Sequence, residues 1–382
     1  MNNNKIIYFD NASTTKVDEL VLECFNKAHQ DYFANPSSIH RLGQEASHVL
    51  SRCKEDILRL LNLNEHQIIF LSGATEANNL AIKGVSLRYK NRGRHIITSI
   101  YEHPSVLEAF KQLENEFGFE VSYLQPNKDG IITIDAVEKA LRKDTILVSL
   151  MAVNNEIGAI NPIEEIADLL SKYPKVLFHV DAAQAIGKCD RNINFAKVDL
   201  VTISAHKMHG MVGFGALLMK KNIELLPLNS GGGQEYEIRS GTNDLPGALA
   251  FKKTLELALS EQNKRYEHVS KLADKLINYL NGHKDLFESN LPKPINPYII
   301  NFSSLTKKGS VVVEALSNYG IMVSSVSACH SSKEKGSYVV KSLGKSDKVS
   351  NNTIRVSLDY TNTEEEMDCF LSILDKIIGE IR

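Results

Sequence analysis

The sequence predicts an α/β fold in which a large unit holds a mostly parallel sheet of seven strands and a smaller α+β unit follows it. Between residues 67 and 219, short apolar runs alternate with amphipathic helical segments. Strands that are apolar along their whole length and are joined by helices belong to parallel sheets covered on both faces. After about residue 233, a long helical region precedes a looser alternation of strands and helices, which is typical of a separate unit.

The elements of the large unit follow in order from this pattern. Two helices come first, at residues 17–28 and 45–61, with an irregular stretch at 34–40 between them. The expected strands are residues 68–71, 95–100, 119–124, 146–153, 176–180, 200–204 and 214–219. The expected helices between them are residues 74–89, 105–117, 134–141 and 163–173. Ligands bind at the carboxyl ends of the strands in such sheets, so we seek functional residues at that edge.

The small unit begins after a helical region at residues 246–280, and a proline-rich run at 292–297 marks a rigid connection. Its expected elements are a strand at 298–302, a helix at 310–319, a strand at 321–324, a polar loop to about 352, a strand at 353–359 and a helix at 363–381. We expect the large domain to span residues 14–255, and the small one to combine residues 1–13 with 256–382.

Composition narrows the function classes. The chain has 382 residues, of which 43% are hydrophobic and 24% charged, and this excludes a disordered chain. Its 44 Lys and Arg against 46 Asp and Glu give a formal net charge of −2, which argues against strong nucleic-acid binding. No apolar run reaches the roughly 18 residues of a membrane-spanning helix. The first residues show no secretion signal, so we expect a cytoplasmic enzyme.

The most informative motif is Ser-Ala-His-Lys at residues 204–207, at the end of an apolar strand. Neighbours there would desolvate the amine of Lys207 and lower its pKa, which favours the free amine that forms a Schiff base. An exposed loop lysine is the alternative interpretation of this motif taken alone. Ser204 and His206 flank the lysine and can add hydrogen-bond donors.

Two further pieces lie at the same edge of the predicted sheet. Asp181 ends a neighbouring strand and can pair with the protonated ring nitrogen of a pyridine cofactor. It can also cap the following helix, and the two roles are compatible. Gly73, Ala74 and Thr75 form a strand-to-helix turn whose free N–H groups suit a phosphate. Together with Lys207, these residues indicate pyridoxal 5′-phosphate as cofactor.

Four other polar side chains follow or begin predicted strands. His103 can stack on an aromatic cofactor and move protons, although a lone histidine can also be an ordinary loop residue. Asn155 and Gln184 offer amides to a ring hydroxyl or a substrate carboxylate. Arg355 begins a strand of the small unit, and its guanidinium can bind a carboxylate with two hydrogen bonds.

The five cysteines are odd in number and widely spaced, which fits neither a disulfide framework nor a zinc site. We expect reduced thiols and no metal. Cys24 reads as a core residue and Cys189 as a structural thiol. Cys329 differs, because it lies beside a histidine in a polar loop, and exposed cysteines of this kind are the reactive ones. The context alone leaves open whether Cys329 is a nucleophile.

These motifs, in this order, resemble the cysteine desulfurase family, the NifS-like and IscS-like members of the fold-type I, class V aminotransferase-like pyridoxal-phosphate enzymes. The match runs from Tyr-Phe-Asp-Asn-Ala-Ser-Thr-Thr at residues 8–15 to the last helix. Its most specific motifs are Asn-Pro-Ser-Ser-x-His at 35–40, Val-Asn-Asn-Glu-Ile-Gly at 153–158, Arg-Ser-Gly-Thr at 239–242 and Ser-Ala-Cys at 327–329.

The resemblance implies a role for each residue. Lys207 corresponds to the Schiff-base lysine, His103 to the histidine that stacks on the ring and Asp181 to the partner of the ring nitrogen. The residues that match contacts to the ring oxygen or the phosphate are Gln184, Thr75, Ser204, His206 and, from the other subunit of a homodimer, Thr242. The residues that match the substrate side are Asn11, Asn155 and Arg355, with Cys329 as the nucleophile that carries the persulfide.

The implied reaction converts L-cysteine to L-alanine and leaves a persulfide on Cys329, from which sulfur passes to an acceptor protein for iron–sulfur cluster assembly or tRNA thiolation. The long loop between Cys329 and Arg355 resembles that of members able to reach a partner's active site. Two segments depart from the family pattern, since Met-Val-Gly at 211–213 replaces Pro-Lys-Gly and Tyr-Glu at 236–237 replaces an Arg-Gly-like pair. The chain also ends soon after its last helix, without the tail with which housekeeping members bind a scaffold, so the acceptor stays open.

Three other functions stay open on the sequence. One is a related lyase acting on selenocysteine or cysteine sulfinate, and another is an aminotransferase of the same superfamily. The third is a non-enzymatic partner protein, which the two departures suggest. The intact set of Lys207, Asp181, His103 and Cys329 argues against it.

Overall fold

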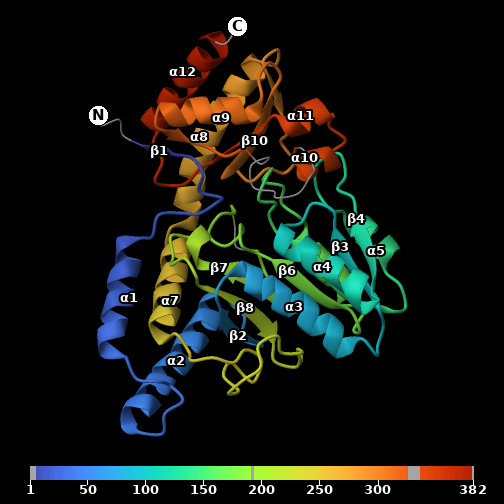
Figure 1. Ribbon diagram of the computed structural model, residues 1–382, viewed down its shortest axis with the longest axis vertical. Coiled ribbons are helices and arrows are strands. Elements are labelled where there is room, and N and C mark those ends of the chain that lie inside the picture. The colour runs from blue at the N-terminus through green and yellow to red at the C-terminus, as the bar shows by residue number, and fades with distance from the viewer. Residues whose placement is uncertain (1–5, 191–192, 326–335, 381–382) are drawn as a thin grey trace.

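The computed structural model describes residues 6–190, 193–325 and 336–380 (Figure 1). The central sheet lies in the lower part of the view, and a smaller part above it holds both ends of the chain. Among the residues described, no helix is both long and apolar enough to cross a membrane.

The central sheet has seven strands in the order β2-β8-β7-β6-β5-β3-β4. The strands are β2 (His66–Leu71), β3 (His95–Ser99), β4 (Glu120–Leu124), β5 (Thr145–Met151), β6 (Leu177–Asp181), β7 (Leu200–Ser204) and β8 (Gly215–Lys220). All neighbours are parallel except β8, which runs antiparallel to β2 and β7. β8 reverses because only the short helix η1 (Ala205–Lys207) and a turn join it to β7, too little chain for a crossover. The predicted fold class and its seven strands are confirmed.

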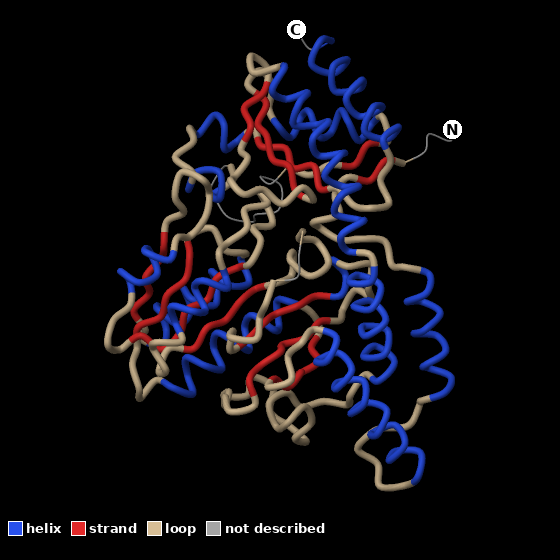
Figure 2. The backbone as a smooth tube through the Cα atoms, turned by 180° about the vertical axis from the view of Figure 1, so that it is seen from behind, coloured by secondary structure: helices blue, strands red, loops and turns tan. Residues whose placement is uncertain are grey.

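Helices cover both faces of this sheet, as the tube seen from behind also shows (Figure 2). One face packs on α3 (Ala74–Tyr89) and α4 (Pro104–Phe117). The helices against the other face are α2 (Arg41–Leu60), α5 (Ile134–Ala140), α6 (Ile163–Leu170) and α7 (Leu245–Ser260), and α1 (Glu19–Asp31) packs on α7. Adjacent side chains such as Leu147 and Val148 enter opposite cores, which explains why the strands read as continuous apolar runs.

A second core lies in the smaller part. There β12 (Thr353–Ser357), β10 (Ile299–Ser304) and β9 (Phe287–Ser289) form an antiparallel sheet, and β1 (Ile7–Tyr8) pairs with β11 (Ile321–Met322). The helices that pack on these strands are α8 (Gln262–Gly282), α9 (Gly309–Asn318) and α12 (Glu364–Glu380). Phe9 is fully buried in this core against Phe370, which holds the amino-terminal segment against the carboxyl-terminal helix.

Two sequence expectations for this region are wrong in detail. The helical region at 246–280 is two helices, α7 and α8, which break at Glu261 because α7 packs on α1 and α2 while α8 packs on β9 and α12. The polar loop predicted to run to residue 352 contains α10 (Tyr338–Ser342) and α11 (Asp347–Asn351). Their caps, Ser337 and Ser346, accept hydrogen bonds from backbone amides three residues on, a signal that the sequence does carry.

Candidate active site

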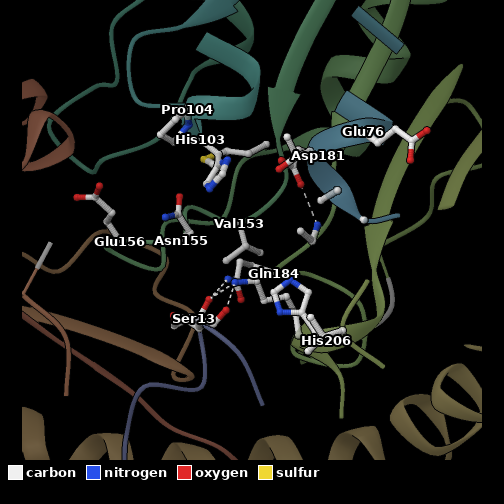
Figure 3. A pocket seen from close by; sticks show the side chains of 18 of the residues that line it. Ser13, Glu76, His103, Pro104, Val153, Asn155, Glu156, Asp181, Gln184 and His206 are labelled. Atoms are coloured by element: carbon white, nitrogen blue, oxygen red, sulfur yellow. Dashed lines mark hydrogen bonds between the residues drawn. The ribbon is translucent and has the colours of Figure 1, made fainter. Parts of the chain in front are cut away.

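A cavity of about 690 Å³ lies at the carboxyl ends of the sheet strands, where the two parts of the chain meet (Figure 3). The predicted site residues that line it are Gly73, Ala74, Thr75, His103, Asn155, Asp181, Gln184, His206, Lys207 and Arg355. In the view of Figure 3, His103 and Asp181 lie across the pocket from Ser13, Gln184 and His206. Residues far apart in the sequence are thus brought to one site.

Lys207 extends from the end of η1 into this cavity. Its Nζ donates hydrogen bonds to the backbone oxygens of Ala12, at 2.6 Å, and Ser13, at 2.5 Å. Burial lowers the pKa of Lys207 to about 7, and the nearby cations Lys188 and Arg355 add to the effect. A large share of this amine is therefore neutral near pH 7 and is able to act as a nucleophile.

Asp181 lies at the end of β6 and is 5% exposed. Its Oδ1 accepts a hydrogen bond from the backbone N–H of Ala183 at 3.0 Å, and its Oδ2 accepts one from Nδ2 of Asn78 at 2.8 Å. Residues 183–187 form turns and not a helix, so the predicted capping of a helix is wrong, and Oδ1 holds the turn after β6 instead. Two neutral donors hold the carboxylate in place without cancelling its charge.

His103 precedes α4 and caps it, because its Nδ1 accepts from the backbone N–H of Ser105 at 3.1 Å. The hydroxyl of Ser105 also lies 2.8 Å from Nδ1. A backbone N–H can only donate, so Nδ1 is unprotonated and a neutral His103 ring carries its proton on Nε2. His103 is a loop residue, but these hydrogen bonds hold its imidazole ring in one orientation. The ring projects into the pocket in Figure 3.

The amino terminus of α3 opens on the same cavity. Gly73 caps this helix with a φ of 151° and offers no side chain, so the first amide groups of the helix have no side-chain cap among the described residues. Such a terminus, with the positive end of the helix dipole behind it, favours an anion. The hydroxyl of Thr75 lies within its first turn, where it can add a donor.

The small part contributes a cation on the other side of the cavity. Arg355 donates from Nη1 to the backbone oxygen of Asn155 at 2.9 Å and from Nη2 to Oδ1 of Asp10 at 2.9 Å. Its Nε and the Oδ1 of Asn155 are buried and have no hydrogen-bond partner among the described residues. Next to Asn155, Glu156 accepts from the hydroxyl of Ser337 at 2.5 Å, and burial raises its pKa to about 7.

Comparison with known proteins identifies the family. The family model described as Aminotransferase class-V matches residues 7–370. Cysteine desulfurase IscS of Dictyoglomus turgidum is 38% identical over 385 residues, which cover 98% of this chain and 95% of that protein. A solved NifS-like protein has a TM-score of 0.89 at 35% identity and covers 98% of this chain and 100% of its own. The structure of SspA in complex with cysteine has a TM-score of 0.80 at 32% identity, over 94% of this chain and 100% of that one.

The chain belongs to the NifS/IscS-like cysteine desulfurases. The resemblance seen in its motifs is confirmed. Membership of this class V family implies dependence on pyridoxal 5′-phosphate, so the residues around the cavity have to suit that group.

The residues present fit the cofactor of a cysteine desulfurase. Besides the amine, carboxylate, imidazole and uncapped helix, two buried polar atoms near the cavity have no partner among the described residues: Oε1 of Gln184 and Oγ of Ser204. Leaving a buried polar group unpaired costs roughly 1–3 kcal/mol, so the cavity wall at Gln184 suits a polar ligand. The other amide atom of Gln184, Nε2, donates to the backbone oxygen of Ala12 at 2.9 Å and orients the side chain.

Some predicted desulfurase site residues do not line this cavity. Asn11 is buried outside it, and its Nδ2 donates to the backbone oxygens of Ser357 at 3.0 Å and Tyr8 at 3.2 Å. Ser204 is buried in β7, and Thr242 is exposed elsewhere. Cys329 lies outside the described residues.

Sequence reasoning missed three contributors. The carbonyl groups of Ala12 and Ser13, which hold Lys207, carry no side-chain signal. Asn78, which holds Asp181, does carry one, since it is a polar residue between Ala77 and Leu80 on the apolar face of a helix.

The cysteines partly follow expectation. Cys53 and Cys189 are buried. Cys24 is only half-buried, so its assignment to the core is wrong, because α1 is covered by α7 on one side alone. Among the described residues, no cluster of three or more His, Cys, Asp or Glu side chains could hold a metal ion.

The two departures from the family pattern lie at the surface. Val212 is 72% exposed and lines the mouth of the cavity. Tyr236 and Glu237 have positive φ angles of 61° and 63°, conformations that favour glycine. The buried carboxylate of Glu235 stabilises this turn, since it accepts from Nζ of Lys54 at 2.8 Å and from the backbone N–H of Phe70 at 2.9 Å.

Proposed function

We propose that this protein is a pyridoxal-phosphate-dependent cysteine desulfurase, which converts L-cysteine to L-alanine and takes the sulfur as a persulfide on Cys329. The observation that carries the proposal is the amine of Lys207, whose pKa is lowered to about 7 in a cavity shared with Asp181, His103 and Arg355. The named relatives and the cysteine complex of SspA support cysteine as the substrate.

The large part would hold the cofactor. In this proposal Lys207 bonds covalently to it, Asp181 pairs with its ring nitrogen, and His103 lies on its ring. When bound, the cofactor withdraws electrons from the α-carbon of the amino acid. Its phosphate would lie on the residues Gly73, Ala74, Thr75, Ser204 and His206, and its ring oxygen near Gln184.

The small part, together with Asn155 of the large part, would bind and react with the substrate. Arg355 and Asn155 are proposed to hold the carboxylate of L-cysteine. Asn11 is proposed to hold the amino-terminal segment, to which Lys207 donates its hydrogen bonds. The thiolate of Cys329 attacks the sulfur of the substrate, so that an S–S bond forms as the C–S bond breaks. The electron pair of the broken bond stays with the substrate carbon, which takes up a proton, and Lys207 or His103 is placed to deliver it.

Several proposed features rest on the family alone. Thr242 is exposed and outside its own cavity, which supports the proposal that it serves the phosphate site of a second copy in a homodimer. The sulfur acceptor would be an iron–sulfur scaffold or a tRNA-thiolation enzyme. The division into residues 14–255 and 1–13 with 256–382 is kept as a proposal, although position 255 lies inside α7. Location in the cytoplasm stays a prediction.

The deciding experiment combines an absorption spectrum of the purified protein with assays of alanine and persulfide, on the wild type and on Cys329→Ala. We expect a visible cofactor band in both proteins, with alanine and persulfide formed by the wild type and persulfide lost in the variant. Persulfide formation that survives in Cys329→Ala would refute the proposed nucleophile. A band without alanine from L-cysteine would refute the substrate, and the related lyase or aminotransferase reaction would then be tested.

A further inference from the structure

Asn78 is a fully buried polar residue that the proposed chemistry does not use. It lies on α3, one turn after the amino terminus that opens on the cavity, and its exposure is 0%. Ala77, Leu80 and Ala81 around it are also buried, and apolar side chains would suit this helix face better. Asparagine is also a poor helix former, so packing and propensity do not explain its presence.

The contacts of Asn78 join two residues of the cofactor site. Its Nδ2 donates to Oδ2 of Asp181 at 2.8 Å and to the hydroxyl of Ser105 at 2.9 Å. The orientation of the amide is unambiguous, because an ionised carboxylate can only accept. Since the Ser105 hydroxyl accepts from Asn78, its own proton is available for Nδ1 of His103, 2.8 Å away. One amide therefore lies at the centre of a chain from Asp181 to His103.

We propose that Asn78 is a positioning residue of the cofactor site, which fixes Asp181 and His103 relative to each other through a single side-chain amide. The inference rests on the proposed function, because both of these residues are assigned to the same cofactor. Asp181 comes from β6 and His103 from the turn before α4, and α3 contacts both β6 and α4. The helix that offers its amino terminus to the phosphate thus also sets the two groups at the ring.

The neutrality of the amide matters for this role. A lysine or arginine at position 78 would form an ion pair with Asp181 and neutralise the charge that the ring nitrogen requires. The other acid close to Asp181 is Glu102, and burial raises its pKa to about 8, which leaves it mostly protonated at pH 7. Asn78 therefore orients the carboxyl group of Asp181 without placing a charge beside it. This arrangement leaves the Oδ1 of Asn78 buried with no hydrogen-bond partner among the described residues.

Three variants of the full chain separate positioning from simple structural support. Asn78→Leu keeps the branched shape and the number of side-chain heavy atoms and removes both hydrogen bonds, whereas Ser105→Ala removes only the branch to His103. Asn79→Ala is the matched control: it also loses an asparagine amide from α3, but Nδ2 of Asn79 donates to the backbone oxygens of Thr75, at 2.9 Å, and Ser105, at 3.4 Å. These two hydrogen bonds reach neither Asp181 nor the side chain of His103.

The first readout is the dissociation constant of pyridoxal 5′-phosphate, followed by its visible band. Loss of a hydrogen bond to a charged group weakens binding roughly 10-fold to 100-fold, so we expect a change of this size in Asn78→Leu. Ser105→Ala and Asn79→Ala should stay within about threefold of the wild type. The thermal unfolding midpoint of each protein without cofactor shows whether the variant is folded.

The second readout is the pH dependence of alanine formation. The acid limb should move to higher pH in both Asn78→Leu and Ser105→Ala, because the hydroxyl then donates less strongly or not at all to the unprotonated Nδ1 of His103. It should not move in Asn79→Ala. If Asn78→Leu does not fold, Ser105→Ala still tests the branch to His103.

Two results would overturn the inference. One is a folded Asn78→Leu protein with the cofactor affinity and pH profile of the wild type, and the other is an equal loss in Asn79→Ala. Failure of the proposed function looks different, because the cofactor would then bind with the predicted differences among variants while L-cysteine gave no alanine.

Discussion

The cavity has a large wall, formed by the large part of the chain, and a small wall, formed by the small part. The two walls hold their side chains in different ways. On the large part, Asp181 and His103 are each held by neighbours from the same wall, Asn78, Ala183 and Ser105. On the small part, Arg355 is held by the carboxylate of Asp10 and the backbone oxygen of Asn155.

This difference suits two kinds of ligand, a cofactor that stays bound and a substrate that is exchanged. The partners in the large part are neutral donors, which leave the charge of Asp181 available to a ligand. The partner of Arg355 is an anion of the same kind as a substrate carboxylate, so that a ligand competes with Asp10 for the guanidinium. The large wall is therefore organised before any ligand arrives, which suits a cofactor that stays. We predict that the small wall changes partners when the substrate binds and leaves.

Lys207 gives the largest expected effect. Replacing it by alanine removes the only amine among the cavity-lining residues that are described, so we expect the visible cofactor band to disappear and alanine formation to fall by at least ~10³-fold. The free energy of unfolding of the cofactor-free protein should not fall, since a buried lysine with a lowered pKa contributes no net stability at pH 7. Retained activity in Lys207→Ala would contradict the proposal that the large wall holds the cofactor through this amine.

Arg355→Gln tests the small wall. It removes the charge but keeps a donor, and a charge-assisted hydrogen bond is worth roughly 1.5–3 kcal/mol, so kcat/KM for L-cysteine should fall about 10-fold to 150-fold. Most of the loss should appear in KM. Arg142→Gln is a suitable control, because Arg142 is paired with Asp144 and Glu120 at the exposed surface.

Lys188→Met tests whether a neighbouring charge lowers the pKa of Lys207. Lys188 is 6% exposed, and its charge is the largest contributor after burial to the low pKa of Lys207. Without it, the pKa of Lys207 rises from about 7 toward its ordinary value, so less amine is neutral at pH 7. The rate of cofactor uptake at that pH should fall by several-fold and recover as the pH is raised. The same profile in Lys188→Met and the wild type would contradict this cause.

Glu102→Gln should have the smallest effect on the activity, since we expect it to change only the stability of the fold. Burial raises the pKa of Glu102 to about 8, against about 4.5 when unfolded, so the folded state binds this proton more tightly. The wild type should therefore lose stability as the pH rises from about 4.5 to 8, whereas the glutamine variant avoids that loss. In urea unfolding at pH 9, we expect a gain of several kcal/mol over the wild type, and none at pH 4. Parallel curves at both pH values would show that Glu102 is ionised in the folded protein.

The fold and most of the pocket could be predicted because both depend on local patterns. Apolar runs mark buried strands, and His103, Asp181 and Lys207 come directly after such runs or end them, where a parallel sheet collects its carboxyl ends. The predicted strands therefore agree with the structure, and so does the position of these residues at one edge.

What could not be predicted depends on contacts between distant segments. The carbonyl groups that hold Lys207 come from Ala12 and Ser13, about 195 positions away, and a backbone oxygen has no residue-type signature. Asn11 belongs to the same segment, and its burial outside the cavity follows from hydrogen bonds to β12, not from its own sequence context. The break between α7 and α8 likewise follows from the two cores on which they pack.

The most direct test of the two-wall account is a paired measurement on Asp181→Asn and Arg355→Gln: the dissociation constant of pyridoxal 5′-phosphate and the KM for L-cysteine in each. The account predicts that Asp181→Asn alters cofactor affinity and its band, while Arg355→Gln raises KM at least ~10-fold and leaves cofactor affinity within about twofold. If Arg355→Gln weakened the cofactor as much as it weakened cysteine binding, the division between a resident and an exchangeable side of the cavity would be wrong.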